Sequence, residues 1–136
     1  MQPITVQTIV KNKIETVWNA MTDPKHIVNW NFAEDTWHCP KASNDLRPGG
    51  KLSATMAAKD GSFSFELVGI YDEIRPLESI RYTLADGRKV ALQFHEKEGT
   101  VVVTETFDPE SVNPVEMQQA GWQMILNNFA KYAESL

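Results

Sequence analysis

The sequence predicts an α+β domain in which helices cover one face of an antiparallel sheet. Three observations lead to this prediction. A β-branched segment comes first, and two short helical segments follow it. Turn motifs then separate a series of strand-like segments by short links, as antiparallel strands allow. The chain finally carries the apolar spacing of one long helix, and elements in this order pack as helices on a sheet.

The first strand and the two short helices lie in the first quarter of the chain. Residues 4–10 (ITVQTIV) are rich in β-branched residues and predict a strand. Asn12 is the candidate N-cap of the first helix, with the glutamate three residues on completing a capping box. Asp23 ends this helix and can cap a second, short one over residues 24–30, with Pro24 in its first turn. The apolar face of the first helix comprises Ile14, Val17, Trp18 and Met21.

Turn chemistry divides the middle of the chain. The Arg-Pro-Gly-Gly motif at 47–50 is typical of a type II turn. Three further glycine-containing motifs predict hairpin loops at 59–62, 85–88 and 96–99. The strands between these turns are expected near residues 51–57, 63–74, 79–84, 89–96 and 100–107. In the fourth of them, Val90, Leu92 and Phe94 alternate with other residues at the period of a half-buried strand.

The end of the chain predicts the longest helix. Asn113 is its candidate N-cap, Pro114 suits its first turn, and Glu116 completes a start that resembles a capping box. We expect about 20 helical residues, roughly 30 Å, which can cross a small domain. At Gly121 we expect the helix backbone to pack closely, because an exposed mid-helix glycine costs about 1 kcal/mol. The apolar face comprises Gln118, Trp122, Ile125, Leu126, Phe129, Tyr132, Ala133 and Leu136.

Length and charge narrow the class of protein. The 136 residues fit one domain, expected to span residues 1–136. The formal net charge is −5 and no basic stripe interleaves with aromatic residues, so we expect neither nucleic acid nor an anionic membrane surface as a partner. No apolar segment approaches the about 20 residues of a membrane span, and the start does not resemble a secretory signal. A soluble, cytoplasmic location is therefore expected, without membrane insertion.

The sequence predicts no metal or other cofactor. Cys39 is the only cysteine, which leaves no thiolate cluster for zinc. If the segment around it is extended, His38 and Cys39 point to opposite faces and cannot share a ligand. His26 and His95 have no ligand spacing with them. The glycines before Lys51 do not form a phosphate loop, because the earlier glycine and the following Ser or Thr of that motif are missing.

Several motifs together carry a family resemblance across nearly the whole chain. They are Trp18, Thr22-Asp23-Pro24, Trp30, Trp37-His38-Cys39-Pro40, residues 44–51 (NDLRPGGK), residues 104–107 (TETF), Gln118, Gly121-Trp122, Ile125-Leu126 and Phe129. With the order of elements, they resemble the START-like helix-grip (SRPBCC) superfamily, in the branch named after the activator of the ninety-kilodalton heat-shock-protein ATPase. The resemblance implies a sheet of about six or seven strands curled around the last helix, with a cavity between them. The superfamily includes lipid carriers, polyketide aromatases and cyclases, and hormone receptors.

The expected cavity gives a set of candidate site residues. A strongly curved sheet and one helix cannot touch along their full length, so we expect a void of order 300–1,000 Å³ with the second helix as its lid. The predicted ligand-binding residues are Trp30, Trp37, His38, Met56, Phe65, Phe94, Glu105, Trp122, Ile125 and Phe129. Glu105 is of special interest because it shares a strand face with apolar residues, where burial would raise its pKa. Asp45 is expected to brace the turn at 47–50, and Glu66 to lie on a solvated strand face.

Three functions remain open at this point. The first is binding of an apolar or amphipathic small molecule, without catalysis, by a monomer or homodimer. The second is an enzyme of the aromatase/cyclase or hydrolase type that uses the same cavity, with His38 or Glu105 as proton relay. The third is a chaperone-associated protein interaction in a stress response. A titratable residue deep in the cavity favours the second, and a large exposed apolar patch favours the third.

Overall fold

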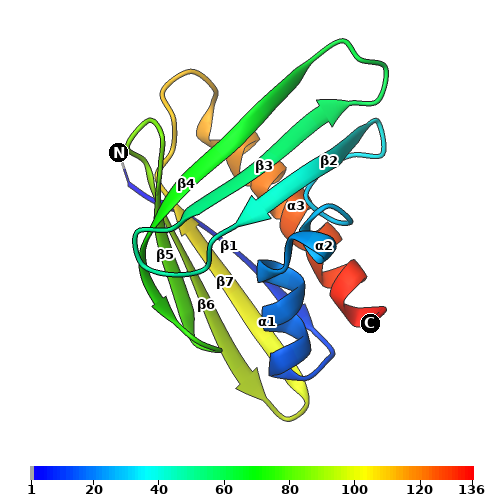
Figure 1. Ribbon diagram of the computed structural model, residues 1–136, viewed down its shortest axis with the longest axis vertical. Helices are drawn as coiled ribbons and strands as arrows, with labels where there is room; N and C mark the ends of the chain where they lie inside the picture. Colours follow the sequence, from blue (N-terminus) through cyan, green and yellow to red (C-terminus); the bar gives the residue numbers. More distant parts are fainter. Residues whose placement is uncertain (1) are drawn as a thin grey trace.

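A seven-stranded antiparallel sheet curls around one long helix in the computed structural model, which describes residues 2–136. The predicted α+β class and the strand number are confirmed (Figure 1). The strands are β1 (Ile4–Val10), β2 (Trp37–Asn44), β3 (Lys51–Ala58), β4 (Ser64–Arg75), β5 (Ser79–Leu84), β6 (Lys89–Lys97) and β7 (Thr100–Phe107). The helices are α1 (Ile14–Thr22), α2 (Pro24–Ile27) and α3 (Val115–Glu134).

The strand order explains how the sheet curls. It runs β1-β7-β6-β5-β4-β3-β2, so β2 to β7 form a meander and β1 pairs with the last strand. The register shifts once in the β2–β3 pair, after His38, and once in the β4–β5 pair, after Tyr71. Such irregularities bend a strand and increase its twist. In Figure 1, β2, β3 and β4 accordingly fan away from β5, β6 and β7.

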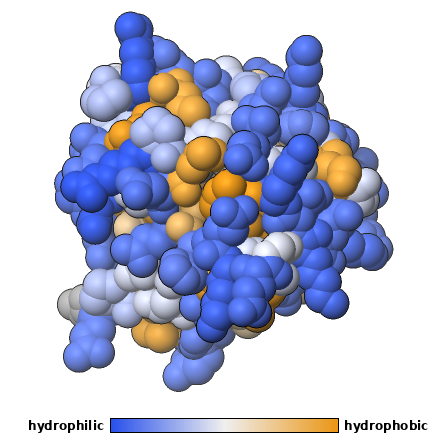
Figure 2. Space-filling model, turned by 90° about the horizontal axis from the view of Figure 1, so that it is seen from below, coloured by the Kyte–Doolittle hydropathy of each residue, from blue (hydrophilic) through white to orange (hydrophobic). Residues whose placement is uncertain are grey.

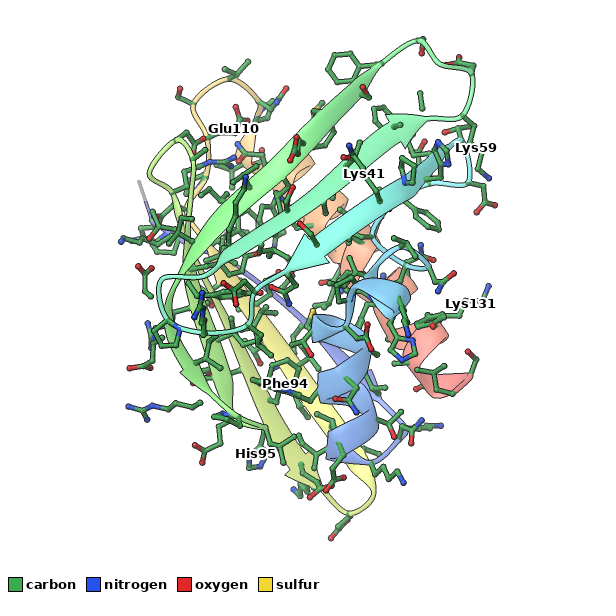
Figure 3. The ribbon with its side chains drawn as sticks, viewed as in Figure 1. Lys41, Lys59, Phe94, His95, Glu110 and Lys131 are labelled. Carbon is green, nitrogen blue, oxygen red and sulfur yellow. The ribbon has the colours of Figure 1, made fainter. Side chains whose placement is uncertain are left out.

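The concave face of the sheet carries the apolar residues of each strand. On β6 these are Val90, Leu92 and Phe94, which are buried as their alternation predicts. Side chains of opposite parity on the same strand, such as His95, are exposed. Figure 3 shows Phe94 between the sheet and α1. The period of two therefore identifies the inward face.

The two short helices lie in their predicted places, but α2 ends at Ile27 instead of Trp30, and the predicted cap of α1 is wrong. Asp23 caps α2 as expected, because its Oδ1 accepts from the backbone N–H of Lys25 at 2.9 Å. Asn12 does not cap α1, whose N-cap is Lys13 without a side-chain bond. The Asn12 amide instead donates to the backbone oxygens of Ala133 and Leu136, at 3.0 and 3.1 Å. It thus adds a side-chain hydrogen bond to carbonyl groups at the C-terminal end of α3, where α-helical i+4 partners run out.

The long helix α3 has the predicted length of 20 residues but a different start. Its N-cap is Pro114, and Asn113 offers its backbone oxygen, not its side chain, to the amide of Gln118 at 2.8 Å. The expected close packing at Gly121 is wrong, because a Cβ there would meet no atom within 4 Å. Helix α3 packs chiefly along β1, and it stands away from the sheet on the side of β3 and β4.

The predicted turns are present. At 47–50, the N–H of Gly50 donates to the oxygen of Arg47 at 2.8 Å, and Gly49 has a φ of 83°, as a type II turn requires. Asp45 braces this turn through its carboxylate, 2.9 Å from Nε of Arg47. Within residues 2–136, no helix combines the length and the apolar character that a membrane span needs.

A candidate ligand-binding cavity

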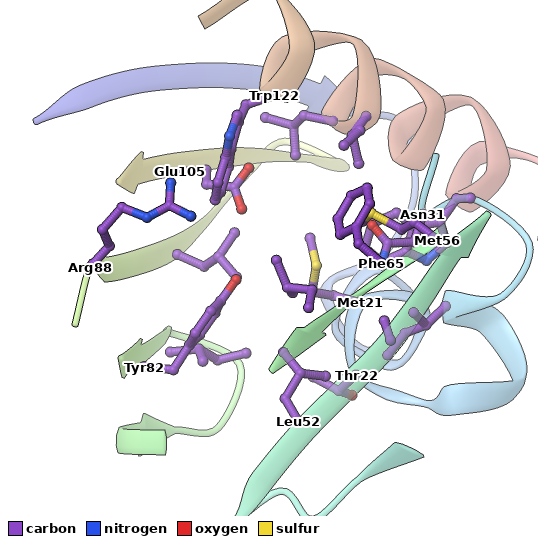
Figure 4. Close-up of a pocket in the computed structure, with 18 of the residues that line it drawn as sticks. Met21, Thr22, Asn31, Leu52, Met56, Phe65, Tyr82, Arg88, Glu105 and Trp122 are labelled. Carbon is purple, nitrogen blue, oxygen red and sulfur yellow. The ribbon is translucent and has the colours of Figure 1, made fainter. Parts of the chain in front are cut away.

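A cavity of about 320 Å³ lies where α3 and the sheet separate. Strands β3 to β7 form its floor, α3 its roof, and the segment that includes α2 one end, as the close-up in Figure 4 shows in part. The apolar part of the lining includes Met21, Ile27, Leu52, Ala54, Leu67 and Leu92. These residues come from three strands and the α1–α2 region, so no continuous sequence segment encodes the wall.

Helical and strand periodicity supply the remaining apolar wall. Trp122, Ile125 and Leu126 line the cavity from α3 at the spacing i, i+3 and i+4. The Trp122 ring stacks on the ring of Phe107, with centroids 3.8 Å apart and planes 9° from parallel. This stack attaches α3 to β7 and holds the indole at the edge of the void.

The structure brings part of the predicted site together. Trp30, Met56, Phe65, Glu105, Trp122 and Ile125 all line the cavity. Trp30 is not on a free lid, because its Nε1 donates to the Ala20 oxygen at 2.8 Å and its ring contacts that of Phe129 edge-on. Whether these six residues bind a ligand remains a prediction.

Two predicted site residues lie deeper in the core than expected. Phe94 packs under α1, where its ring centroid is 5.2 Å from that of Trp18. Phe129 is fully buried on the sheet side of α3 and does not line the cavity. The reason is that α1 and α2 already cover that end of the concave face, so the void is confined to the other end.

The other two lie on β2 outside the cavity. Trp37 joins an aromatic cluster with Phe63 and Phe65, whose ring centroids are 6.0 to 6.2 Å apart. His38 is exposed while Cys39 is buried, so the two point to opposite faces as the extended geometry predicts. The Cys39 thiol lies 3.5 Å from the oxygen of Lys41, and burial raises its pKa. No group of three potential metal ligands occurs among residues 2–136.

Glu105 gives the cavity a titratable group. It shares the inward face of β7 with Val101, Val103 and Phe107, which are buried. The carboxyl group faces the void, and protein surrounds it closely enough that desolvation raises its pKa to about 8. No side chain or backbone group of residues 2–136 forms a hydrogen bond with this carboxyl. Glu66, in contrast, is exposed and accepts a hydrogen bond from Ser53 on the outer face.

Tyrosines on the neighbouring strands extend the polar end. Tyr71 donates from its hydroxyl to Oδ1 of Asn44 at 2.6 Å, and burial raises its pKa to about 12. Tyr82 is 6% exposed, and its hydroxyl has no hydrogen-bond partner in the described part of the chain. Burial, and then the negative charge of Glu105, raise the pKa of Tyr82 well above its usual value. Gly69 makes room for the Tyr82 ring, since a Cβ there would lie 2.7 Å from it.

The hairpin between β5 and β6 and the loop before α3 close this end. Arg88 lines the cavity, and Figure 4 shows its guanidinium directed toward Glu105. Its Nε donates to Oδ2 of Asp86 at 2.7 Å. Gln118 fastens the loop onto α3, because its side chain bonds the backbone N–H and oxygen of Glu110 at 2.8 and 3.0 Å.

Asn31 forms a second polar position across the void. It lies beside Met56 and Phe65 in Figure 4, on the side opposite Glu105 and Arg88. Asn31 is only 7% exposed, and its side-chain amide has no partner within residues 2–136. Sequence analysis missed Asn31, Tyr82 and Arg88 as lining residues. The alternation of buried residues on β5 was a signal for Tyr82, whereas nothing in the sequence marks a loop asparagine as inward-facing.

The surface shown in Figure 2 is mainly hydrophilic, with small apolar areas between charged side chains. The exposed apolar residues are scattered over several elements. Phe63, 59% exposed, lies at the β3–β4 hairpin, while Val112 and Met117 lie near the start of α3. Phe63 adjoins the exposed ring of Phe65, whereas the single exposed apolar residues elsewhere are normal for a protein surface.

Comparisons with known proteins agree with this architecture. Residues 11–134 match the family described as Activator of Hsp90 ATPase homolog 1-like protein. The solution structure of an AHSA1-like protein from Aeromonas hydrophila is 39% identical, with a TM-score of 0.92 over 98% of this chain and 92% of that one. A protein from Cytophaga hutchinsonii is 48% identical, with a TM-score of 0.83 over 97% and 92%.

A more distant structure shares the fold alone. A protein from Chromobacterium violaceum is 22% identical, with a TM-score of 0.87 over 98% of this chain and 99% of that chain. The comparison with curated proteins gave no match.

Proposed function

The chain belongs to the family of Activator of Hsp90 ATPase homolog 1-like proteins, of the START-like helix-grip fold, and we propose that its cavity binds an apolar or amphipathic small molecule. The observation that carries this proposal is a void with a mainly apolar lining and a few unpartnered polar groups. Small-molecule sites have this composition, because apolar walls supply affinity and a few polar groups fix orientation.

The volume and the lining restrict what can bind. About 320 Å³ accommodates a molecule of a few fused rings or a short chain, rather than a peptide segment. The polar groups stand at the two ends, Asn31 at one and Glu105 with Tyr82 at the other. A ligand with an apolar centre and a polar group at one or both ends would therefore contact the apolar wall and form hydrogen bonds with the polar side chains.

A neutral environment-sensitive dye tests this proposal. We expect Nile red to bind with about 1:1 stoichiometry and a rise in fluorescence, as apolar sites produce. Ala54→Phe places a ring inside the void from β3, so it should abolish binding. Ala57→Phe adds the same ring on the outer face of β3 and should leave binding unchanged. Equal binding by both variants would place the dye elsewhere and contradict the proposal.

Acid–base catalysis in the same cavity is the second candidate, and Glu105 is the observation that favours it. A carboxyl group with a pKa near neutrality can donate or accept a proton in a reaction. His38 takes no part in this alternative, because it is exposed on β2 and does not line the cavity. If the chain is a hydrolase of this kind, the unaltered protein should hydrolyse 4-nitrophenyl butyrate faster than the Glu105→Gln variant does. Equal rates for the two proteins would remove the alternative.

A protein-interaction role is favoured only by the cluster of Trp37, Phe63 and Phe65. Chaperone contact in a stress response would use such an exposed aromatic group, since aromatic residues are enriched at interfaces. Phe63→Ser would then weaken binding to a purified ninety-kilodalton heat-shock protein in a calorimetric titration. Absence of heat with the unaltered chain would exclude this partner.

A further inference from the structure

We propose that Glu105 and Tyr82 form a pair of neutral hydrogen-bond donors that selects a ligand with an uncharged carbonyl oxygen, such as an aromatic ketone. This inference rests on the proposed function and adds the chemical class of the ligand. It concerns one end of the cavity, where two hydrogen-bonding groups have no protein partner.

The sheet register directs both groups to the same space. Glu105 on β7 pairs with Leu92 on β6, and Tyr82 on β5 pairs with Val90, two residues away on the same strand. All four side chains belong to the concave face, so Glu105 and Tyr82 flank β6 from either side. Both line the cavity, and Figure 4 shows the carboxyl and the hydroxyl directed into it.

The Tyr82 ring is held in place by its neighbours. The ring lies against the backbone of Gly69, and the Tyr71 ring meets it edge-on with centroids 6.0 Å apart. The hydroxyl of Tyr71 is already committed to Asn44. Tyr82 is therefore a fixed donor, and because its hydroxyl is open to the cavity instead of sealed in protein, its partner comes from the cavity.

The charged groups around Glu105 leave it protonated near neutral pH. The titratable and charged side chains at this end are Tyr71, Tyr82, Arg88 and Glu110. The Nε of Arg88 donates to Asp86, and although the guanidinium is directed toward Glu105, no hydrogen bond or ion pair joins these two side chains within residues 2–136. The Glu110 carboxylate accepts the N–H groups of Val112 and Asn113. With a pKa of about 8, Glu105 is mainly the acid at neutral pH, and an acid donates one O–H bond.

Two O–H donors match one carbonyl oxygen. That oxygen has two lone pairs and no charge, so it can accept from both groups without ionising either. A hydrocarbon of the same shape leaves both donors unsatisfied, which is how polar sites reject analogues that lack the acceptor. An ammonium group offers only donors and requires Glu105 to ionise, and a carboxylate brings a charge into an apolar void.

Matched probes test the selection. 2-Acetylnaphthalene and 2-ethylnaphthalene share a ring system and differ by a carbonyl in place of a methylene group. At about pH 6.5 we expect the ketone to displace Nile red about tenfold more tightly than the hydrocarbon. Tyr82→Phe and Glu105→Leu should each lower this ratio several-fold, and the affinity for 2-ethylnaphthalene should be retained or should rise, because a donor that the hydrocarbon leaves unsatisfied is gone. Retained hydrocarbon binding also shows that each variant is folded with its cavity intact.

The pH dependence identifies the acid. In the unaltered protein the ketone preference should fall by several-fold at about pH 9.5, where Glu105 is ionised. Glu105→Gln keeps an N–H donor at the same place, so it should retain the preference at both pH values. A preference that is independent of pH in the unaltered protein would contradict the role of Glu105.

The remaining outcomes separate this inference from the proposed function. Equal affinity for the two probes, or stronger binding of 1-(2-naphthyl)ethylamine or 2-naphthoate, would overturn the carbonyl selection while the cavity still binds a ligand. Binding of Nile red but of neither naphthalene would overturn it as well. Failure of Nile red to bind at all would refute the proposed function, and this inference with it.

Discussion

Glu105 determines how the charge of the cavity depends on pH. The pKa of the glutamate is about 8 in the folded chain, against a usual value of 4.5. Between these values the folded state holds a proton that the unfolded state has released, so the free energy of unfolding falls as pH rises. The stabilising contribution is complete below about pH 4.5 and is lost as pH rises through about 8.

Glu105→Gln removes this dependence. In urea denaturation, we expect the free energy of unfolding of the variant, relative to that of the unaltered protein, to increase by on the order of 2–4 kcal/mol from about pH 5 to about pH 8.5. The range allows for water in the cavity, which reduces the desolvation of the carboxyl. Parallel stability curves for the two proteins would mean that the group titrates as an exposed carboxyl.

Gly69 is predicted to be essential for the position of Tyr82. In Gly69→Ala the new Cβ would lie 2.7 Å from a buried ring that Tyr71 also confines, so the ring must move. We expect a loss of about 1–3 kcal/mol of stability in urea denaturation, as for other overpacked cores. We also expect a weaker ketone preference, because the Tyr82 hydroxyl shifts. A neutral effect on both measurements would show that the ring relaxes freely.

At the scale of the helix, we predict that alanine at Gly121 has the opposite effect on stability to alanine at Gly69. A Cβ at this position of α3 meets no atom, so Gly121→Ala gains helix propensity without a clash. We expect up to about 1 kcal/mol of added stability, measured by urea denaturation, in contrast to Gly69→Ala. Destabilisation would reveal packing on α3 that this geometry lacks.

The ends of the helices and strands show which features the local sequence determines and which depend on distant parts of the chain. Asp23 and the turn at 47–50 act on neighbours within a few residues, and both were predicted correctly. Asn12 looks like a local cap, yet its amide bonds the end of α3, more than a hundred residues along the chain. A side chain with two possible partners cannot be assigned from the local pattern alone, because tertiary contact decides between them.

At the scale of the whole molecule, periodicity predicted the inward faces but not the extent of the void. Alternation placed Phe94 on the concave face, and helical spacing placed Phe129 on the buried side of α3. Both nevertheless lie outside the cavity, because α1 fills one end of the curl. Glu105 was found from its apolar strand neighbours, whereas Asn31 and Arg88 reach the void from irregular segments without a periodic signal.

The helices cover the sheet unevenly, and the last prediction follows from this. Helix α3 packs on β1, and α1 packs on β6 and β7, but β3 and β4 face the void. Opening free energies are lowest where few apolar contacts are buried. In hydrogen exchange we therefore expect the amides of the β3–β4 pair to exchange faster than those of the β1–β7 pair.

Occupation of the cavity should slow that exchange. A saturating ligand stabilises the state that binds it, by about 2.7 kcal/mol at a concentration of 100 times Kd. We expect 2-acetylnaphthalene to protect β3 and β4 selectively, and Ala54→Phe to protect them without ligand because its ring fills the void. Ala57→Phe, on the outer face of the same strand, should exchange like the unaltered protein. Equal protection of all strands by ligand would show that binding stabilises the sheet as one unit, and that the void does not limit the stability of β3 and β4.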